Sequence, residues 1–479
     1  MINILRRILS INYMLKPHQA TSELPSTKDV YKLTFKTAWP SALEAFFVGF
    51  IGLCDTIMVG ALKGDLGTRA IAAIGITGQP RMILLTFVFS LNVGVTAVVA
   101  RRKGENDRKR ANETLYQSLL VCFCIVILMG ALGIIFAEQF MRFAGAKDDI
   151  IEFAVDYFRI TSVGFIFSGL GMVINAAQRG IGNTKISMHT NIIANLVNVT
   201  FNFLLISGRF GFPRLEVRGA AIATVISSCV MFTICVVKVI KKNNAVEEYN
   251  FLRLSFKIKE YIPTIDTMRS IINVGSSALV EQLCLRVGFF AFARIIADLG
   301  TVALSTHHMC MNILSISFTF GDGLGIAAAS LVGRNLGAKR PDMAIIYGKV
   351  SQRMALMVST VLFFVFTLGR YSLIGLFTDD PNIIRVGALL MIVIAFISPF
   401  QTSQVVISGS LRGAGDTKFV AITSLIGVGI LRPVIAWALC YPLGWGLIGA
   451  WISILFDQIL RIILNFWRFA KGEWTKKKV

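Results

Sequence analysis

Residues 179–185 read RGIGNTK, and residues 412–418 read RGAGDTK. The second stretch follows the first by 233 positions, and the same shift places residues 65–68 (DLGT) on residues 298–301 (DLGT). One register that holds across most of the overlap indicates a duplicated half and not a chance match. Residues shared by both copies are candidates for scaffold, whereas a polar residue found in one copy needs a separate explanation.

The composition of the chain is that of a membrane protein. Of its 479 residues, 55% are hydrophobic and 16% are charged, and the mean hydropathy is +0.68. We count twelve apolar stretches, each of about 20 residues or more, which is long enough to cross a bilayer as a helix. They lack the alternating pattern of a membrane β-barrel. We therefore expect an all-α integral membrane protein, with twelve transmembrane helices in two pseudo-symmetric six-helix bundles.

The positive charges set the orientation. The net charge is +21, and Lys and Arg gather in residues 1–36, 101–110, 238–259 and 468–479, whereas the alternate loops carry few. The positive-inside rule then places both termini and the central linker in the cytoplasm, in a multi-pass protein of the plasma (inner) membrane. Because the charge lies at helix ends facing anionic lipid, the expected partner is the lipid bilayer and not nucleic acid.

The longest polar interruption divides the chain into two halves. We expect a cytoplasmic tail, an amino-terminal lobe of helices 1–6, a cytoplasmic linker, a carboxyl-terminal lobe of helices 7–12 and a second tail, at residues 1–33, 34–242, 243–264, 265–470 and 471–479. Six crossings per half return the chain to the cytoplasm, so the two copies are parallel. Two such lobes in one chain can enclose a cleft by themselves, and we expect a monomer.

The two repeated turns have a structural explanation. Their glycines allow one helix to end, and Asn183 or Asp416 can cap the next helix. The alternative is a phosphate-binding loop. Neither copy follows a strand or has the lysine spacing of such a loop, so we favour the structural role.

Polar side chains in the apolar helices of the amino-terminal half are functional candidates, since a charge there costs about 2.5–3.5 kcal/mol on insertion scales. The first helix carries Asp55, and the fifth carries asparagines at 191, 195, 198 and 202, all on one helical face. The shift of 233 places Asp55 on Gly288, and Asn198 and Asn202 on Leu431 and Ile435. Asn175 and Thr224 fall on Ser408 and Asp457, so the other half mostly lacks this carboxylate and amide cluster. Interhelical packing contacts explain Asn191 and Asn195 best.

Two chemistries suit this cluster, and the residues leave both open. A carboxylate with amide and hydroxyl oxygens can bind a hard cation such as Na⁺. Asp55 could instead hold a proton, because burial disfavours the charged form of a carboxyl group. We expect no cofactor other than this coupling ion, H⁺ or Na⁺, and no metal beyond Na⁺ at Asp55.

Two acids of the carboxyl-terminal half form a second candidate site for substrate or cation. Glu281 in the seventh helix could bind a cation, or could pair with Arg286, which lies five residues further on. Asp322 stands among glycines and either lines the cleft or caps a helix break.

Two other sets of embedded charges are found in the apolar helices, one with a simple explanation and one with none. Asp457 and Arg461 are four residues apart on the last helix and most simply pair with each other. Glu44 and Arg81 are also embedded, and no motif assigns them a role.

Taken in order, these motifs resemble the MATE (multidrug and toxic compound extrusion) family over residues 30–470. The resemblance rests on Pro40, on the two repeated turns, and on residues 55–60 (DTIMVG), 219–224 (GAAIAT) and 298–304 (DLGTVAL). It implies cation-coupled efflux of organic cations by two six-helix lobes that alternate between inward-facing and outward-facing states.

The resemblance also implies site residues. The positions matching the amino-terminal cation site of the DinF branch are Asp55, Asn175, Asn198, Asn202 and Thr224. This chain departs at Asn202, where that branch usually has a second aspartate, and this leaves the stoichiometry open. Glu281 matches a glutamate of the NorM branch, but residues 386–409 contain no acid where that branch has an aspartate.

Pro40 lies fifteen residues before Asp55 in the first helix. A proline there frees a backbone carbonyl and permits bending. We hypothesise that protonation or ion binding at Asp55 changes this bend and expels substrate from the amino-terminal lobe.

The sequence therefore favours an antiporter that exports organic, mostly cationic, drugs and toxic compounds by alternating access. Its 36 Phe and 16 Met would give adaptable contacts to such small-molecule substrates. The alternative is a lipid-linked oligosaccharide flippase, which would need a cationic cleft, and the candidate arginines are few: Arg81, Arg286 and Arg432. We do not expect an enzyme, because we find no clustered acids for a metal and no HExxH motif.

Overall fold

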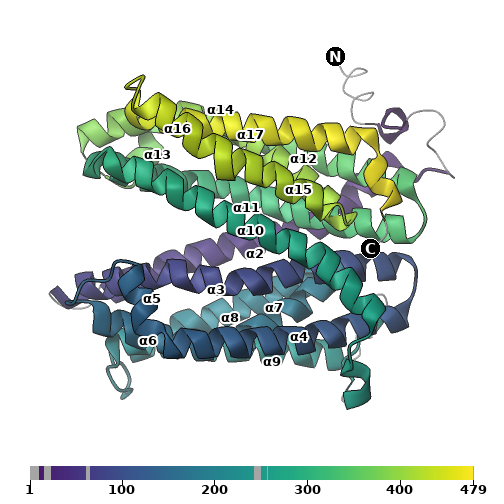
Figure 1. Cartoon of the computed structure of the whole chain (residues 1–479), viewed down its shortest axis with the longest axis horizontal. Coiled ribbons are helices and arrows are strands. Elements are labelled where there is room, and N and C mark those ends of the chain that lie inside the picture. Colours follow the sequence, from purple (N-terminus) through teal and green to yellow (C-terminus); the bar gives the residue numbers. More distant parts are fainter. Residues whose placement is uncertain are drawn as a thin grey trace. The chain divides into compact units, whose positions relative to one another are not determined.

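The computed structural model describes residues 10–15, 23–60, 65–241, 250–255, 257–378 and 380–477, and every regular element within them is a helix (Figure 1). The amino-terminal half comprises α2 (Thr27–Gly60), α3 (Asp65–Gly104), α4 (Arg108–Ile135), α5 (Ala137–Phe143), α6 (Ile151–Val163), α7 (Phe165–Gly180), α8 (Thr184–Leu205) and α9 (Glu216–Ile240). The carboxyl-terminal half comprises α10 (Ile265–Asp298), α11 (Thr301–Gly337), α12 (Pro341–Leu368), α13 (Arg370–Gly375), α14 (Pro381–Gly413), α15 (Thr417–Ser424), α16 (Arg432–Cys440) and α17 (Gly446–Lys471). A π-helical segment, η4 (Leu425–Leu431), joins α15 to α16, and short 3₁₀ turns are η1 (Ile11–Tyr13), η3 (Ile258–Tyr261) and η5 (Glu473–Lys476).

These helices account for the twelve expected crossings. Within the described residues, eight continuous spans are long and apolar enough to cross a membrane, and α6 with α7 makes a ninth that is bent by 48°. The other three are α2, α8 and α10, with 34, 22 and 34 residues. At about 1.5 Å per residue each of them can also cross about 30 Å of hydrocarbon. Glu44 and Asp55 lie on α2, the asparagines at 191, 195, 198 and 202 lie on α8, and Glu281 lies on α10.

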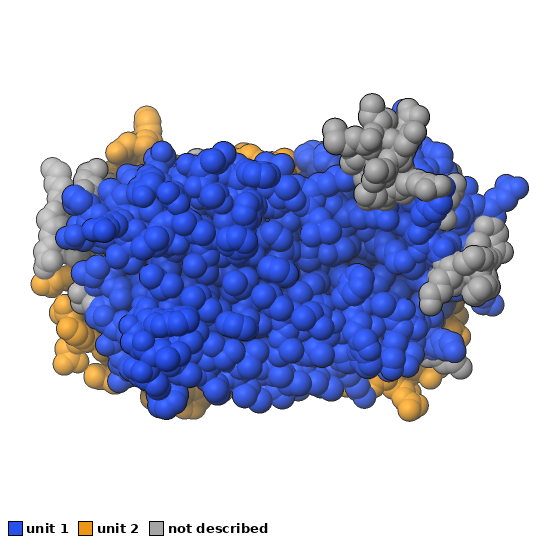
Figure 2. All heavy atoms as spheres, turned by 90° about the horizontal axis from the view of Figure 1, so that it is seen from above, with its two compact units in different colours: residues 1–42, 104–106, 280–479 blue, residues 43–103, 107–279 orange. Residues whose placement is uncertain are grey.

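The chain folds into two compact units (Figure 2). Unit 1 contains residues 1–42, 104–106 and 280–479, and unit 2 contains residues 43–103 and 107–279. Each half therefore lies mostly in one unit, but the change of unit falls within α2 and within α10. The first helix of each half thus contributes to both units.

The repeated turns are scaffold in both units. A Cβ on Gly180 would lie 2.9 Å from the carbonyl oxygen of Thr96, and one on Gly413 would lie 2.2 Å from the carbonyl oxygen of Ala329. Thr96 and Ala329 are themselves related by the shift of 233. The second glycines of the turns, at 182 and 415, have φ of +86° and +85°, which side chains rarely adopt. The glycine pattern therefore serves the same close helix crossing twice.

The prediction that Asn183 and Asp416 cap the following helices is wrong. Asn183 and Asp416 do occupy the positions before α8 and α15, but neither side chain accepts a cap hydrogen bond. Asn183 donates to Gln178 Oε1 at 3.1 Å, and Asp416 pairs with Arg468 at 2.7 Å. In both turns the side chain binds another side chain and not the backbone N–H groups of the following helix.

Candidate functional site

Three of the five predicted coupling residues come together in unit 2. Asn198 on α8 donates from Nδ2 to Thr224 Oγ1 on α9 at 3.5 Å, and Asn202 donates from Nδ2 to Asn198 Oδ1 at 3.2 Å. Both asparagines are buried, with 5% and 1% of their surface exposed. Asp55 lies on α2, but its side chain lies outside the described residues. The structure therefore shows a cluster of amide and hydroxyl groups. For the acid, Asp55, it shows only the helix on which the residue lies.

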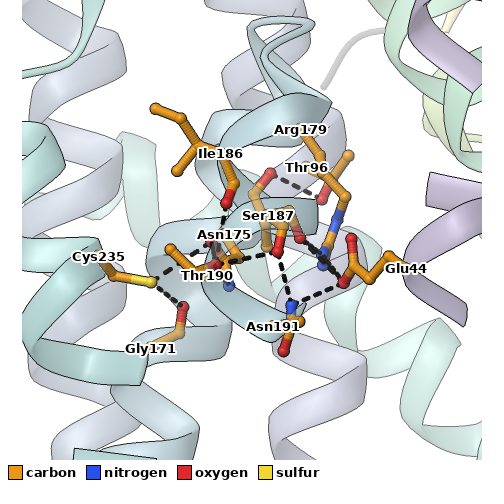
Figure 3. A network of polar contacts seen from close by, with 11 residues as sticks. Glu44, Thr96, Gly171, Asn175, Arg179, Ile186, Ser187, Thr190, Asn191 and Cys235 are labelled. Carbon is orange, nitrogen blue, oxygen red and sulfur yellow. Dashed lines mark hydrogen bonds and ion pairs between the residues drawn. The ribbon is translucent and has the colours of Figure 1, made fainter. Parts of the chain in front are cut away.

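Asn175 belongs to a different group of contacts. Its Nδ2 lies 3.2 Å from Thr190 Oγ1, and its Oδ1 accepts from the Cys235 thiol at 3.4 Å (Figure 3). Thr190 precedes Asn198 by eight residues on α8, which is about 12 Å along the helix. The sequence placed Asn175 in the same predicted set as Asn198. Only the packing of α7 on α8 decides which turn of α8 Asn175 meets, and spacing along the chain does not show this.

Sequence reasoning left Glu44 without a role, and the structure places it in a polar network of unit 2 (Figure 3). Glu44 Oε1 accepts from Asn191 Nδ2 at 2.8 Å and from Ser187 Oγ at 3.0 Å. Arg179 Nη1 lies 3.9 Å from the same oxygen and donates to Ser187 Oγ at 2.9 Å. The side chains of Glu44 and Arg179 are only 16% and 17% exposed. Asn191 therefore makes the interhelical contact expected of it, with a carboxylate as the partner.

Glu281 is held in an ion pair, but not with Arg286. Arg412, at the end of α14, donates from Nη2 to Oε1 at 2.5 Å and from Nε to Oε2 at 3.3 Å. Ser424 Oγ donates to Oε1 at 3.2 Å, and Glu281 is 2% exposed. Residues five apart on a helix do not share a face as residues three or four apart do. The prediction that Glu281 forms an ion pair is thus confirmed, but its partner is Arg412 of the repeated turn and not Arg286.

The two networks are related by the internal repeat. The shift of 233 places Arg179 on Arg412 and Asn191 on Ser424, but it places Glu44 on Ser277, one helical turn before Glu281. In each half, an acid from the first helix meets the arginine of the repeated turn and a polar residue of the fifth helix. The arginine present in both copies of the turn was the sequence signal that could have predicted these ion pairs. An arginine kept in both copies inside an apolar helix requires an acid nearby.

Asp322 does not cap a helix break. It lies within α11, which is unbroken from Thr301 to Gly337, and its side chain is exposed. Arg412 is near enough to interact with it electrostatically. Pro40 likewise lies within the continuous helix α2 and is buried. Because proline has no N–H, the carbonyl of Lys36 has no donor at that position of the helix.

A second buried acid, Asp457, holds two arginines in unit 1. Arg461 donates from Nε to Oδ1 at 2.8 Å, which confirms the expected pair, and Arg432 donates to Oδ2 from Nε at 3.1 Å and also from Nη2. The Arg432 guanidinium also lies 5.1 Å from the centre of the Phe289 ring. Arg432 follows the π-helical segment, where a Cβ on Gly427 would lie 2.5 Å from Asp457 Oδ1. Arg432 is therefore bound inside unit 1.

No group of three or more His, Cys, Asp or Glu side chains in the described part of the chain could hold a metal ion. The buried carboxylates of Glu281 and Asp457 are compensated by arginines.

Comparisons with known proteins agree with the geometry. The sequence model of the MatE family matches residues 40–204 and 278–438. An uncharacterized transporter of Bacillus subtilis (strain 168), YisQ, is 28% identical over 446 residues, which cover 92% of this chain and 95% of YisQ. A probable multidrug resistance protein NorM of Thermotoga maritima is 26% identical over 468 residues, 97% of each chain.

Solved structures share the fold. One described as the outward-facing conformation of a multidrug resistance MATE family transporter of the MOP superfamily has a TM-score of 0.84 at 19% identity, and the match covers 94% of this chain and 97% of that one. A MOP superfamily transporter from Pyrococcus furiosus has a TM-score of 0.83 at 19% identity, with the same coverage. The twelve-helix, two-lobe architecture expected from the sequence is confirmed.

Proposed function

Since this chain belongs to the MatE family, we propose that it is a multidrug efflux transporter that exports organic, mostly cationic, compounds in exchange for H⁺ or Na⁺. Several relatives along its full length are named as probable multidrug resistance proteins. The observation that supports ion coupling best is the buried cluster of Asn198, Asn202 and Thr224 in unit 2. The counterparts of Asn198 and Asn202, Leu431 and Ile435, are apolar, whereas Thr224 falls on Asp457. Scaffold alone does not require such a difference.

In this proposal Asp55 is the coupling carboxylate. Asn198, Asn202 and Thr224 supply neutral oxygens, and Asn175 acts from the neighbouring group of contacts. Oxygen donors of this kind suit Na⁺, and a lone carboxylate suits a proton. No further cofactor is required.

For the organic cation, the exposed carboxylate of Asp322 is the better candidate in unit 1. Glu281 is buried and its charge is compensated by Arg412, so a cation would first have to displace an arginine. Alternating access of the two lobes in a plasma-membrane monomer, with both termini cytoplasmic, completes the proposal.

The flippase alternative gains little support from unit 1. A pyrophosphate group would need several arginines with free donors. The guanidinium of Arg432 is only 4% exposed and is bound to Asp457, which leaves Arg286, whose Nε is buried without a hydrogen-bond partner among the described residues. An ion-coupled exporter fits the charges of the described residues better.

The test is efflux of ethidium from energised membrane vesicles, with Na⁺ and pH gradients imposed separately. We expect one of the two gradients to drive efflux by the wild type and Asp55→Asn to abolish it. Asp148→Asn is the matched control, because it removes a loop carboxylate that is 92% exposed, and it should leave efflux unchanged. Absence of efflux by the wild type under both gradients would refute the proposal for this class of substrate.

A further inference from the structure

The two repeat-related acids differ in how completely they are bound. Both oxygens of Glu281 accept hydrogen bonds, two from Arg412 and one from Ser424. In Glu44 both hydrogen bonds fall on Oε1, and Arg179 approaches that oxygen no closer than 3.9 Å. The other oxygen, Oε2, is buried and has no hydrogen-bond partner among the described residues. One half therefore has a closed ion pair, and the other has a carboxylate with one acceptor unused.

A buried carboxylate oxygen without a donor is unusual, because water or a protein group normally compensates the lost hydration. A proton needs only a single lone pair of that oxygen, and it removes the buried negative charge, which is the larger part of the cost. A metal cation needs several oxygen ligands around it. Ser187 and Asn191 already use Oε1, and the guanidinium of Arg179 stands beside the site as a positive charge.

The surroundings of Glu44 in unit 2 contain few other charges. α7 contributes Arg179, α8 contributes the neutral Ser187 and Asn191, and α9 contributes the thiol of Cys235, which is bonded to Asn175. Among the described residues, Arg179 is thus the charged group that opposes protonation of Glu44. Arg179 approaches Glu44 through one contact of 3.9 Å, whereas Arg412 donates two hydrogen bonds to Glu281.

We propose that Glu44 is a second proton-binding group of this protein, separate from Asp55, and that its Oε2 is the atom that takes up the proton. Eleven residues of α2 separate the two acids, which is about 16 Å along the helix. Protonation converts the carboxylate to a neutral acid, so Arg179 loses its counter-charge and keeps the hydrogen bond to Ser187. Glu44 follows Pro40 by four residues and follows the change of unit in α2 by two. Proton uptake there weakens the attachment of α2 to α7.

This inference deepens the proposed function, because a proton on Glu44 would take part in the same transport cycle. It can nevertheless be tested without transport. Infrared difference spectra of the full-length protein in lipid vesicles, recorded without substrate or gradient as pH is varied, should show the C=O band of a protonated carboxyl group. Glu44→Gln should remove that component, while the matched replacement Glu281→Gln should leave it in place.

A second variant protects the test against misfolding of Glu44→Gln. Arg179→Gln retains Glu44 and removes the opposing charge, so the band should appear at a pH about 1–3 units higher than in the wild type. A structural role of Arg179 alone would not move the titration. Asp55→Asn should remove a different component, or none, and should leave the Glu44 band.

Three results would overturn the inference. They are a band that persists in Glu44→Gln, a titration that does not move in Arg179→Gln, and loss of the wild-type band when Na⁺ is added at constant pH, since the site would then take Na⁺. Failure of ethidium efflux with the Glu44 band intact would refute the proposed function and leave this inference standing.

Discussion

An acid in a tight buried ion pair is less available to take up a cation than an acid in a loose pair. Glu281 and Glu44 each face an arginine of the repeated turn, at 2.5 Å and 3.9 Å respectively. In double-mutant cycles with glutamine we expect a coupling energy of about 1–3 kcal/mol for Glu281 with Arg412, and a clearly smaller value for Glu44 with Arg179. Chemical denaturation in detergent micelles measures both. Equal coupling in the two pairs would show that the difference in distance has no energetic meaning.

Asp457 is the residue whose loss should be most damaging to stability. It is fully buried and compensates two arginines, so Asp457→Asn leaves an excess of buried positive charge around Arg432 and Arg461. We expect the free energy of unfolding to fall by about 3–5 kcal/mol. Asp298→Asn, at an acid that is 45% exposed and pairs with Arg294 at 3.6 Å, is the control and should change it by less than about 1 kcal/mol.

Among the helices, the crossings at the repeated turns depend on glycine. A methyl group on Gly413 would overlap the Ala329 carbonyl, whereas one on Gly375, in α13, would meet nothing within 4 Å. Gly413→Ala should therefore lower the free energy of unfolding by about 1–3 kcal/mol through overpacking. Gly375→Ala should be neutral or slightly stabilising. If both variants unfold like the wild type, α14 and α11 do not pack as closely as the structure has them.

The helix α2 joins Pro40, Glu44 and Asp55 in one element. If bending at the proline contributes to export, Pro40→Ala restores a backbone hydrogen bond and should slow ethidium efflux without abolishing it. Efflux is measured at matched protein levels, with Pro381→Ala as the control because that proline lies in the first turn of α14, where it replaces no hydrogen bond. Unchanged efflux in Pro40→Ala, with Asp55→Asn inactive, would refute the bend and leave the coupling site standing.

For the whole molecule, hydropathy and the repeat predicted the twelve helices and the turns between them, because the membrane imposes length and apolarity on each span. The contact of Asn198 with Asn202 also followed from spacing along one helix. The pairing of Glu44 with Arg179 and of Glu281 with Arg412 did not, since it depends on which faces of separate helices meet. The shift of 233 places Glu44 one helical turn before Glu281, so a comparison of the two copies could not match these acids.

The central claim for the whole molecule is that export of an organic cation is exchanged for an ion at a carboxylate of the amino-terminal half. It is tested most directly with proteoliposomes in which an ethidium gradient is the only driving force, while H⁺ and Na⁺ movements are recorded with an internal pH dye and radioactive sodium. We predict that ethidium moving down its gradient drives one of these ions the opposite way in the wild type and not in Asp55→Asn. Ethidium transport without ion movement, or ion movement that persists in Asp55→Asn, would contradict the account.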